Sequence, residues 1–164
     1  MVAGGTVMVG VDGSAGSEVA LRYAVEEAAR RGARLTVVTV ARFPDYSATP
    51  IGLSPTAIAD VVDAARGRAR TLVDEAMADR AVRVAAAAPV EVTIDALAGV
   101  PVEVLLGCAA GADLLVLGHR GLGAVRSAVL GSVGLGCVLH APCPVTIVPA
   151  TATAPRVEPA ATRG

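Results

Sequence analysis

Residues 112–133 read ADLLVLGHRGLGAVRSAVLGSV, and this stretch decides the fold class. A short apolar run at 114–117 ends at Gly118, Gly121 follows after two residues, and a Gly-Ser pair at 131–132 precedes another apolar segment. This order is typical of a buried strand, a glycine loop and the start of a helix. Glycines let the backbone approach a ligand closely, and a helix start offers unpaired N–H groups to an anion. The stretch therefore predicts an α/β protein whose glycine loop is suited to a phosphate chain.

The rest of the chain alternates β-branched apolar runs with segments of helical spacing. Strands are predicted at 6–11, 34–41, 90–97, 112–117 and 144–148, and helices at about 14–31, 56–83, 99–111 and 132–141. Ser14 or Ser17 is expected to cap the first helix, and Gly67 is expected to mark a bend or break in the second. The alternation predicts a single α/β domain, doubly wound, with a five-stranded parallel sheet and helices on both faces.

Composition supports an aliphatic core and excludes several classes of protein. The 164 residues are 54% hydrophobic but only 2% aromatic, which suits buried parallel strands covered by Ala-rich helices. The net charge is −1, which argues against a nucleic-acid binder. All 14 basic residues are Arg, so the Lys of a Walker loop and Schiff-base catalysis are both excluded.

The composition of the two ends of the chain, and of a long segment without charged residues, indicates where the domain ends and in which compartment the protein is expected. Residues 127–155 contain no Asp, Glu, Lys or Arg, but Pro142 and Pro144 would break a membrane helix, so we expect a buried helix and strand and no membrane span. Residues 1–149 are expected to form the domain, and the Ala-, Pro- and Thr-rich residues 150–164 a disordered tail. Three cysteines without CxxC spacing are expected to be small buried apolar residues of a reduced, cytoplasmic protein, and the first residues do not resemble a signal peptide.

Three motifs together resemble the universal stress protein family over about residues 5–149. They are GVDGS at 10–14, the spacing G-x2-G-x9-G-[ST] that begins at Gly118, and HAPCPVTIV at 140–148. The resemblance implies the strand order 3-2-1-4-5, which places the topological switch point between the first and fourth strands. It also implies binding of ATP, with Mg²⁺ as an optional companion, and a homodimer formed through residues 144–148.

The resemblance also implies roles for individual positions. Asp12 would lie beside the adenosine, and the backbone of Val40 would meet the adenine ring. The first two glycines of the spaced motif would line the ribose and the first phosphates, and the residues after the loop would hold the outer phosphates. The predicted nucleotide-contacting residues are Val11, Asp12, Val40, Leu117, Gly118, Arg120, Gly121, Gly131, Ser132 and Val133.

Simpler roles remain open for several of these residues. Asp12 is also suited to an Asx turn or a helix cap, and its role toward a ligand, as hydroxyl acceptor or metal ligand, is left open. Arg120 and Arg126 suit charge-assisted bonds to phosphate and a solvated surface equally. His119 lies in the glycine loop but has no nucleophile beside it, so we predict no catalytic residue, no metal site and, at most, slow ATP hydrolysis.

Three functions are consistent with these features. The first is an ATP-binding regulatory or stress-response protein whose nucleotide occupancy tunes its conformation or choice of partner. The second is an adenylating enzyme of a related α/β nucleotide fold, to which GVDGSAGS at 10–17 has a faint likeness. The third is an interaction module without nucleotide, which would use the helix at 56–83 and the loop at 42–55. The charged side chains of that helix are expected to be solvated.

Overall fold

A computed structural model describes residues 4–41, 54–84, 89–121 and 130–150, and these contain five strands and four helices in strict alternation. Their bounds, in chain order, are β1 (Gly4–Val11), α1 (Ala15–Arg31), β2 (Ala33–Ala41), α2 (Pro55–Arg83), β3 (Val92–Ala98), α3 (Pro101–Ala109), β4 (Leu114–Gly118), α4 (Ser132–His140) and β5 (Val145–Val148). Each predicted element is present, with ends that differ from the prediction by about two residues. The predicted tail at 150–164 lies almost wholly outside the described residues.

All five strands form one parallel sheet in the order β3-β2-β1-β4-β5, which confirms the expected topology. The central strand β1 pairs with β2 on one side and with β4 on the other, so that Val9 lies opposite both Val37 and Val116. The chain crosses from β3 at one edge to β4 beyond β1. The topological switch point therefore lies between the carboxyl ends of β1 and β4, where ligands of such folds bind.

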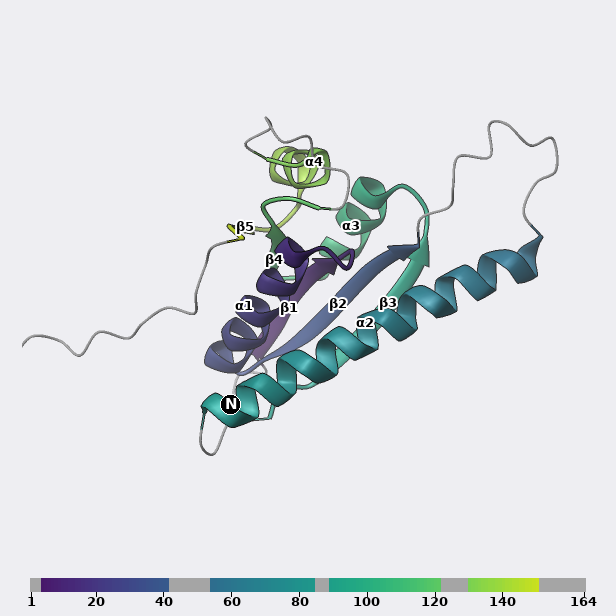
Figure 1. The fold of residues 1–164 in the computed structure, drawn as a ribbon. Helices are drawn as coiled ribbons and strands as arrows, with labels where there is room; N and C mark the ends of the chain where they lie inside the picture. The colour runs from purple at the N-terminus through teal and green to yellow at the C-terminus, as the bar shows by residue number, and fades with distance from the viewer. Residues whose placement is uncertain (1–3, 42–53, 85–88, 122–129, 151–164) are drawn as a thin grey trace, which may run out of the picture.

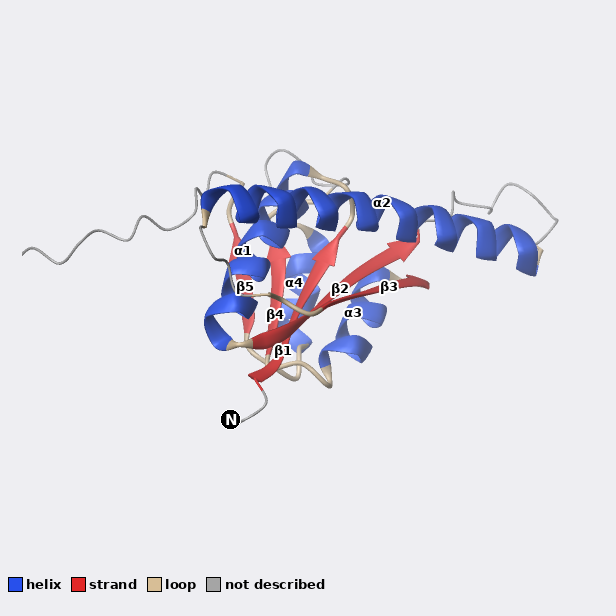
Figure 2. Ribbon diagram, turned by 90° about the horizontal axis from the view of Figure 1, so that it is seen from below, coloured by secondary structure: helices blue, strands red, loops and turns tan. Residues whose placement is uncertain are grey.

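Helices cover both faces of the sheet, as predicted (Figures 1 and 2). On one face α1 and α2 pack over a core that includes Val9, Leu21 and Leu35. On the other face α3 and α4 pack over a smaller core that includes Met8 and Leu115. Because parallel strands are buried on both sides in this arrangement, their sequences read as continuous apolar runs rather than as alternating ones.

Local signals explain where the helices begin and end. The Ser14 hydroxyl accepts a hydrogen bond from the Ser17 amide at 3.2 Å and so caps α1, while Gly32 ends it in the left-handed conformation with φ 60°. Helix α2 begins at Pro55, the last residue of the predicted loop; residues 42–53 lie outside the described part. The expected break at Gly67 is wrong: α2 is one continuous helix through that position, because its neighbours in the helix are good helix formers.

Helix α2 extends beyond the sheet at its amino-terminal end (Figure 2). Its buried residues begin only at Ala65 and then recur every three or four positions as far as Arg80. Arg80 corrects the expectation of a fully solvated charged face, because its side chain is 7% exposed and its Nε lies 3.3 Å from Oε2 of Glu26 on α1. The Arg22 side chain of α1 similarly pairs with Asp79 of α2. The charged face of α2 is therefore partly a contact with α1.

The glycines of α4 allow it to pack closely on its surroundings. A Cβ atom at Gly136 would lie 2.9 Å from Cγ1 of Val102 on α3. The smaller core under α3 and α4 contains all three cysteines, of which Cys137 is buried and the other two are half-buried. Burial raises the pKa of the Cys137 thiol, and the nearby Cys143 raises it further. Cys137 therefore behaves as a neutral packing residue.

Candidate functional site

The turn between β1 and α1 is held by hydrogen bonds among its own polar side chains. The Asp12 carboxylate accepts the Ser14 amide at 3.0 Å and the Ser14 hydroxyl at 2.6 Å through the same oxygen, Oδ1. The Ser17 hydroxyl donates to the Ser14 carbonyl at 2.9 Å and accepts the Asp12 amide at 3.3 Å. The structural role foreseen for Asp12, an Asx turn, is therefore present. The hydroxyls of GVDGSAGS serve this turn, an arrangement that gives no support to an adenylating phosphate loop.

This turn crosses directly over the end of β4. A Cβ atom at Gly118 would lie 2.6 Å from the backbone carbon and oxygen of Gly16, and one at Gly16 would lie 2.5 Å from the carbonyl oxygen of Arg120. The Ser14 hydroxyl also reaches that carbonyl at 3.4 Å. Glycine at 16 and 118 is thus needed because two backbones touch. The crossing brings Asp12 against Gly121, where a Cβ atom would collide with Asp12 Oδ2.

Helix α4 starts beside the same crossing. The Gly131 amide donates to the carbonyl of His119 at 3.1 Å, which ties the start of α4 to the end of β4. Gly131 is the N-cap of α4, and it provides no side-chain hydrogen bond to the first turn. Glycine is not needed here for packing or conformation, since φ is −64° and the nearest atoms to an added Cβ lie at 3.8 Å. Because Gly131 has no side chain, it covers none of the first amides of α4.

A cavity of about 100 Å³ opens between these two turns and α3. All ten residues predicted to contact nucleotide line it, from β1, β2, the end of β4 and the start of α4. Sequence reasoning missed six further lining residues, which are Gly10, Ser17, Val38, Pro101, Leu105 and Gly134. The structure therefore brings the predicted residues together, while their contact with a ligand stays a prediction.

The missed residues form most of the apolar part of the cavity. Val38 lies two residues before Val40, so both side chains point to the same face of β2. Pro101 and Leu105 lie one turn apart on α3, and their spacing in the sequence is the signal that could have placed them on a common helix face. That this face meets β2 depends on tertiary packing. Gly10 keeps the floor open, since a Cβ there would lie 2.8 Å from Cδ2 of Leu117.

The two histidines lie outside the cavity lining. The His119 amide donates to the carbonyl of Val148 at 2.9 Å, which joins the end of β4 to β5. His140 is exposed in the last turn of α4, where a cation would suit the helix dipole. Arg120 lines the cavity, and Arg126 lies outside the described residues. Within the described part of the chain, no three His, Cys, Asp or Glu side chains gather as a metal site.

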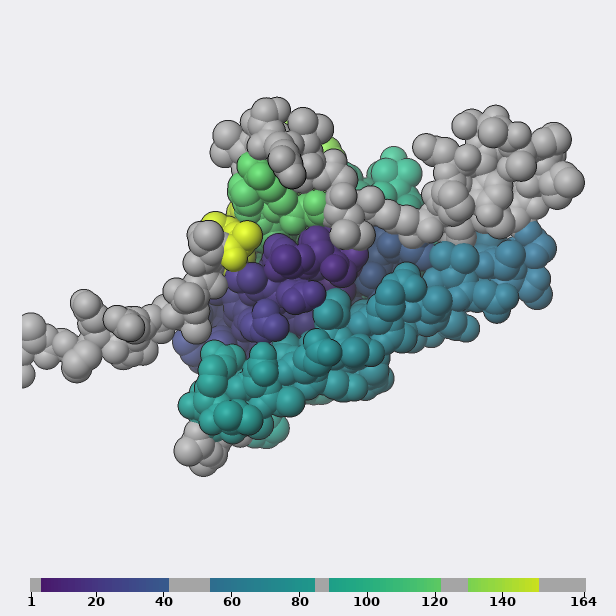
Figure 3. All heavy atoms as spheres, viewed as in Figure 1, coloured from purple at the N-terminus to yellow at the C-terminus, as the bar shows by residue number. Residues whose placement is uncertain are grey.

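The space-filling view shows how the parts of the site meet on the surface (Figure 3). The β1–α1 region (purple) lies between α2 (teal) and the green segment that contains the end of β4. Among the helices of the described residues, none is long and apolar enough to cross a membrane. Fold and site together define a doubly wound α/β protein with a glycine-lined cavity at its topological switch point.

The chain belongs to the universal stress protein family, whose model matches residues 5–149. It is 38% identical over 149 residues to a universal stress protein of Thermus aquaticus, a match that covers 87% of this chain and 97% of the relative. A universal stress family protein of Burkholderia pseudomallei superposes with a TM-score of 0.61 at 31% identity, covering 91% of this chain and 98% of that one. A universal stress protein in complex with cAMP superposes with a TM-score of 0.56 at 28% identity, covering 91% and 99%.

Proposed function

We propose that this protein binds an adenine nucleotide in the cavity between the two turns, with ATP as the ligand. The observation that carries the proposal is the uncapped start of α4, whose first amides, at Ser132 and Val133, belong to residues that line the cavity. An anion placed there would accept hydrogen bonds from these amides and would interact favourably with the helix dipole. The Ser132 hydroxyl and the Arg120 side chain supply further donors.

The remainder of the cavity suits a nucleoside. Its apolar part, which contains Val38, Val40 and Leu105, is a surface for a flat base, and Asp12 is the one carboxylate among the lining residues. Such a carboxylate can accept a bond from a ribose hydroxyl or join the phosphates in holding Mg²⁺. The relative bound to cAMP supports an adenine nucleotide as the class of ligand.

The role of the bound nucleotide is regulatory in this proposal. The residues that line the cavity include no His or Cys, and Ser132 and Asp12 are assigned to holding the nucleotide, which argues for binding rather than efficient catalysis. The start of α4 is linked to β5 through His119, whose carbonyl accepts the Gly131 amide and whose amide donates to Val148. A ligand bound at the phosphate end would therefore change the conformation of β5, at the edge of the sheet, through these hydrogen bonds.

The proposal is tested by isothermal titration calorimetry of the full chain with AMP, ADP and ATP, each with and without Mg²⁺. We expect the wild type to bind, and a Gly131→Val variant to lose at least tenfold in affinity, because the added side chain enters the space above the α4 amides. Gly107→Val is the matched control. Gly107 lies on α3 outside the cavity lining, and an added Cβ there would meet nothing within 4 Å beyond the adjacent backbone of its own helix. Absence of binding by the wild type, or equal affinity in both variants, would contradict the proposal.

We also propose that the protein forms a homodimer through β5. This strand is at one edge of the sheet, and Val145, Thr146 and Ile147 are half-buried. Beside it, α4 exposes Leu135, Val138 and Leu139 along one face. An apolar edge is a hazard unless it is covered, and a second copy across a two-fold axis would cover both edges at once.

Sedimentation equilibrium tests the dimer. The wild type is expected to sediment with twice the mass of the chain, and a Thr146→Lys variant as a monomer, because a charged residue on an edge strand opposes pairing. Thr93→Lys, on the opposite edge strand β3, is the control and should leave the mass unchanged. A monomeric wild type would contradict the proposal.

A further inference from the structure

Helix α4 has little to hold it in the helical conformation. It spans nine residues, two of which are glycines, and only Gly134 and Cys137 among them are buried. No side chain of its N-cap residue bonds the first turn, and no acidic residue lies in that turn. Short uncapped helices are marginal on their own, and each glycine lowers helix stability further. The conformation of α4 therefore depends on a small number of stabilising groups.

Helix α3 has the same length but is better held. It also lacks a side-chain cap, but it begins with Pro101, whose backbone suits the first position of a helix, and it carries Glu103 in its first turn, where a negative charge suits the helix dipole. Its buried residues are Leu105 and Ala109, so a large apolar side chain anchors it. Of these two helices, α4 would therefore gain more from an anion at its start.

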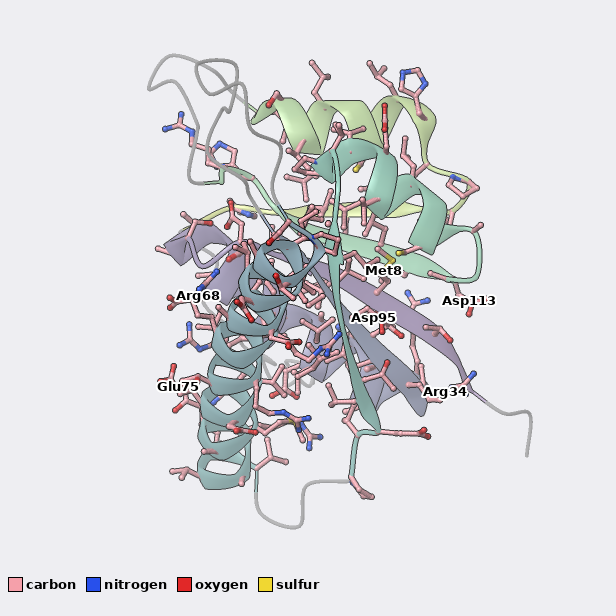
Figure 4. The ribbon with its side chains drawn as sticks, turned by 90° about the vertical axis from the view of Figure 1, so that its right-hand side faces the viewer. Met8, Arg34, Arg68, Glu75, Asp95 and Asp113 are labelled. Atoms are coloured by element: carbon pink, nitrogen blue, oxygen red, sulfur yellow. The ribbon has the colours of Figure 1, made fainter. Side chains whose placement is uncertain are left out.

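The two ends of α4 serve different parts of the proposed function. Ser132 and Val133, in its first turn, line the nucleotide cavity. Leu135, Val138 and Leu139 are 49%, 48% and 65% exposed and form its outer apolar face. Figure 4 shows α4 (yellow-green) above α3, with side chains on its outer side that point away from the rest of the protein. The whole helix is only about 13 Å long, so one short element connects the cavity with this face.

Helix α4 also packs closely against β5, the strand proposed to pair with a second copy. A Cβ atom at Gly134 would lie 3.7 Å from Cδ1 of Ile147 on that strand. Val133 and Ile147 pack on the same apolar core. The exposed face of α4 and the position of the β5 side chains therefore both depend on α4 being helical.

We propose that α4 couples nucleotide binding to self-association. Nucleotide bound at its start stabilises the helix, and the stabilised helix presents the surface on which a second copy of the chain docks. This inference rests on the proposed nucleotide site and on the proposed dimer. The phosphates accept hydrogen bonds from the first amides of α4 and so replace the missing cap. Because such coupling is reciprocal, dimer formation also strengthens nucleotide binding.

Sedimentation equilibrium of the full chain, with and without ATP and Mg²⁺, tests the coupling. We expect ATP to lower the dimer dissociation constant by about tenfold, a size typical of coupled sites. Each dimer holds two nucleotides, so the affinity of each site should differ between dimer and monomer by the square root of that factor, about threefold. Calorimetry should accordingly find that monomeric Thr146→Lys, substituted outside the cavity lining, binds ATP about threefold more weakly. Thr93→Lys, on the opposite edge strand, should bind ATP like the wild type.

Gly131→Ser distinguishes stabilisation of α4 from other routes of coupling. The serine hydroxyl can cap the helix without nucleotide, because the backbone at this position already has an N-cap conformation. We expect the variant to dimerise more tightly than the wild type in the absence of ATP, and ATP to tighten its dimer less. Gly107→Ser, on α3 outside the cavity lining, is the matched control and should leave the dimer dissociation constant unchanged. Circular dichroism establishes that each variant is folded.

Hydrogen exchange of monomeric Thr146→Lys measures the stability of the helix itself, because no second copy covers α4 in this variant. ATP should slow the exchange of amides within α4 by about threefold. One of these is the Leu135 amide, which donates to the carbonyl of Gly131 at 2.9 Å. Amides within α1, which Ser14 already caps, should change little.

Failure of the coupling and failure of the nucleotide site give different results. If the wild type binds ATP but its dimer dissociation constant or the exchange of α4 is unchanged, the coupling is overturned and the nucleotide site stands. Weaker dimerisation in the presence of ATP would overturn it equally. If calorimetry detects no ATP binding, or the wild type is monomeric in both conditions, this inference falls together with the proposal on which it rests.

Discussion

Helices α1 and α4 both begin at the carboxyl edge of the sheet, beside the same cavity, but their first turns are completed in different ways. The N-cap residues have nearly the same backbone conformation, with φ −78° and ψ 154° at Ser14 and φ −64° and ψ 155° at Gly131. Ser14 caps α1 with its own side chain, whereas Gly131 brings no side chain to α4. The start of α1 is capped by a side chain, whereas the start of α4 has no cap from its own N-cap residue, and we propose that a ligand binds there.

In the proposed function, the first of these two similar turns stabilises the fold and the second binds the ligand. A capped helix start stabilises the folded protein in the absence of ligand, typically by about 1 kcal/mol. An uncapped start gives up that stabilisation, and a bound anion can restore it. The crossing of Gly16 over Gly118 holds both starts at one place. Substitutions at these positions should therefore separate stability from ligand binding.

The largest effect is expected when the crossing itself is broken. In Gly118→Val the added Cβ would lie 2.6 Å from the Gly16 backbone, so the two turns must move apart. We expect a loss of about 3 kcal/mol in the free energy of unfolding, the upper range for overpacking. Urea denaturation followed by circular dichroism measures it. Gly67→Ala, in open space on α2, should instead stabilise the protein by about 0.5–1 kcal/mol. Similar effects of the two substitutions would show that the crossing is not a tight contact.

Ser132→Asp places a fixed negative charge where the phosphate is proposed to bind. The hydroxyl donor is lost and a like charge is added, so nucleotide affinity should fall by about 10- to 100-fold. The stability of the empty protein should be unchanged or higher by up to about 1 kcal/mol, because a carboxylate suits a helix start. Calorimetry and urea denaturation measure the two quantities on one preparation. Tighter or unaltered nucleotide binding would argue against phosphate at this position.

Ser14→Ala, at the start of α1, should lower stability but have little effect on nucleotide affinity, the reverse of what is expected for Ser132→Asp. It removes the cap of α1 and one of the two hydrogen bonds that Asp12 accepts from Ser14, so we expect a loss of about 1 kcal/mol in stability. Nucleotide affinity should change less than in Ser132→Asp, because the α4 amides are untouched. Thermal and urea denaturation measure the stability. If affinity falls more in Ser14→Ala than in Ser132→Asp, the assignment of roles to the two turns is reversed.

The smallest change is expected when α4 is given a cap like that of α1. Gly131→Ser suits the existing backbone conformation, and its hydroxyl can bond the first-turn amides. Stability should rise by a few tenths of a kcal/mol, and nucleotide affinity should fall by about two- to fivefold as the new side chain competes for those amides. Competition titration against a fluorescent AMP analogue resolves such a difference. Rising affinity would mean that the amides are not the binding groups.

The sequence predicted the alternation of strands and helices because it depends on local patterns, namely β-branched apolar runs and helical spacing. The spacing of Gly118, Gly121 and Gly131 identified the loop, whereas the strand order and the other site residues came from the family resemblance. Pro101 and Leu105 were missed because only the packing of α3 against β2 carries them to the cavity. The burial of Arg80 was missed for the same reason, since nothing in α2 itself reveals its contact with Glu26. The local sequence also overestimated the effect of Gly67 on α2. The free-energy cost of one glycine in a helix is small compared with the stabilisation that the packing of the surrounding residues provides.

The most direct test of the proposed site is an amide NMR titration of the full chain with ADP. The amides of Ser132 and Val133 are expected to shift strongly and in proportion to occupancy, whereas that of Ser17, already bonded to Ser14, should move little. Binding of ADP without movement of the α4 amides, or with larger shifts in the first turn of α1, would contradict the proposal that the uncapped helix start holds the phosphates.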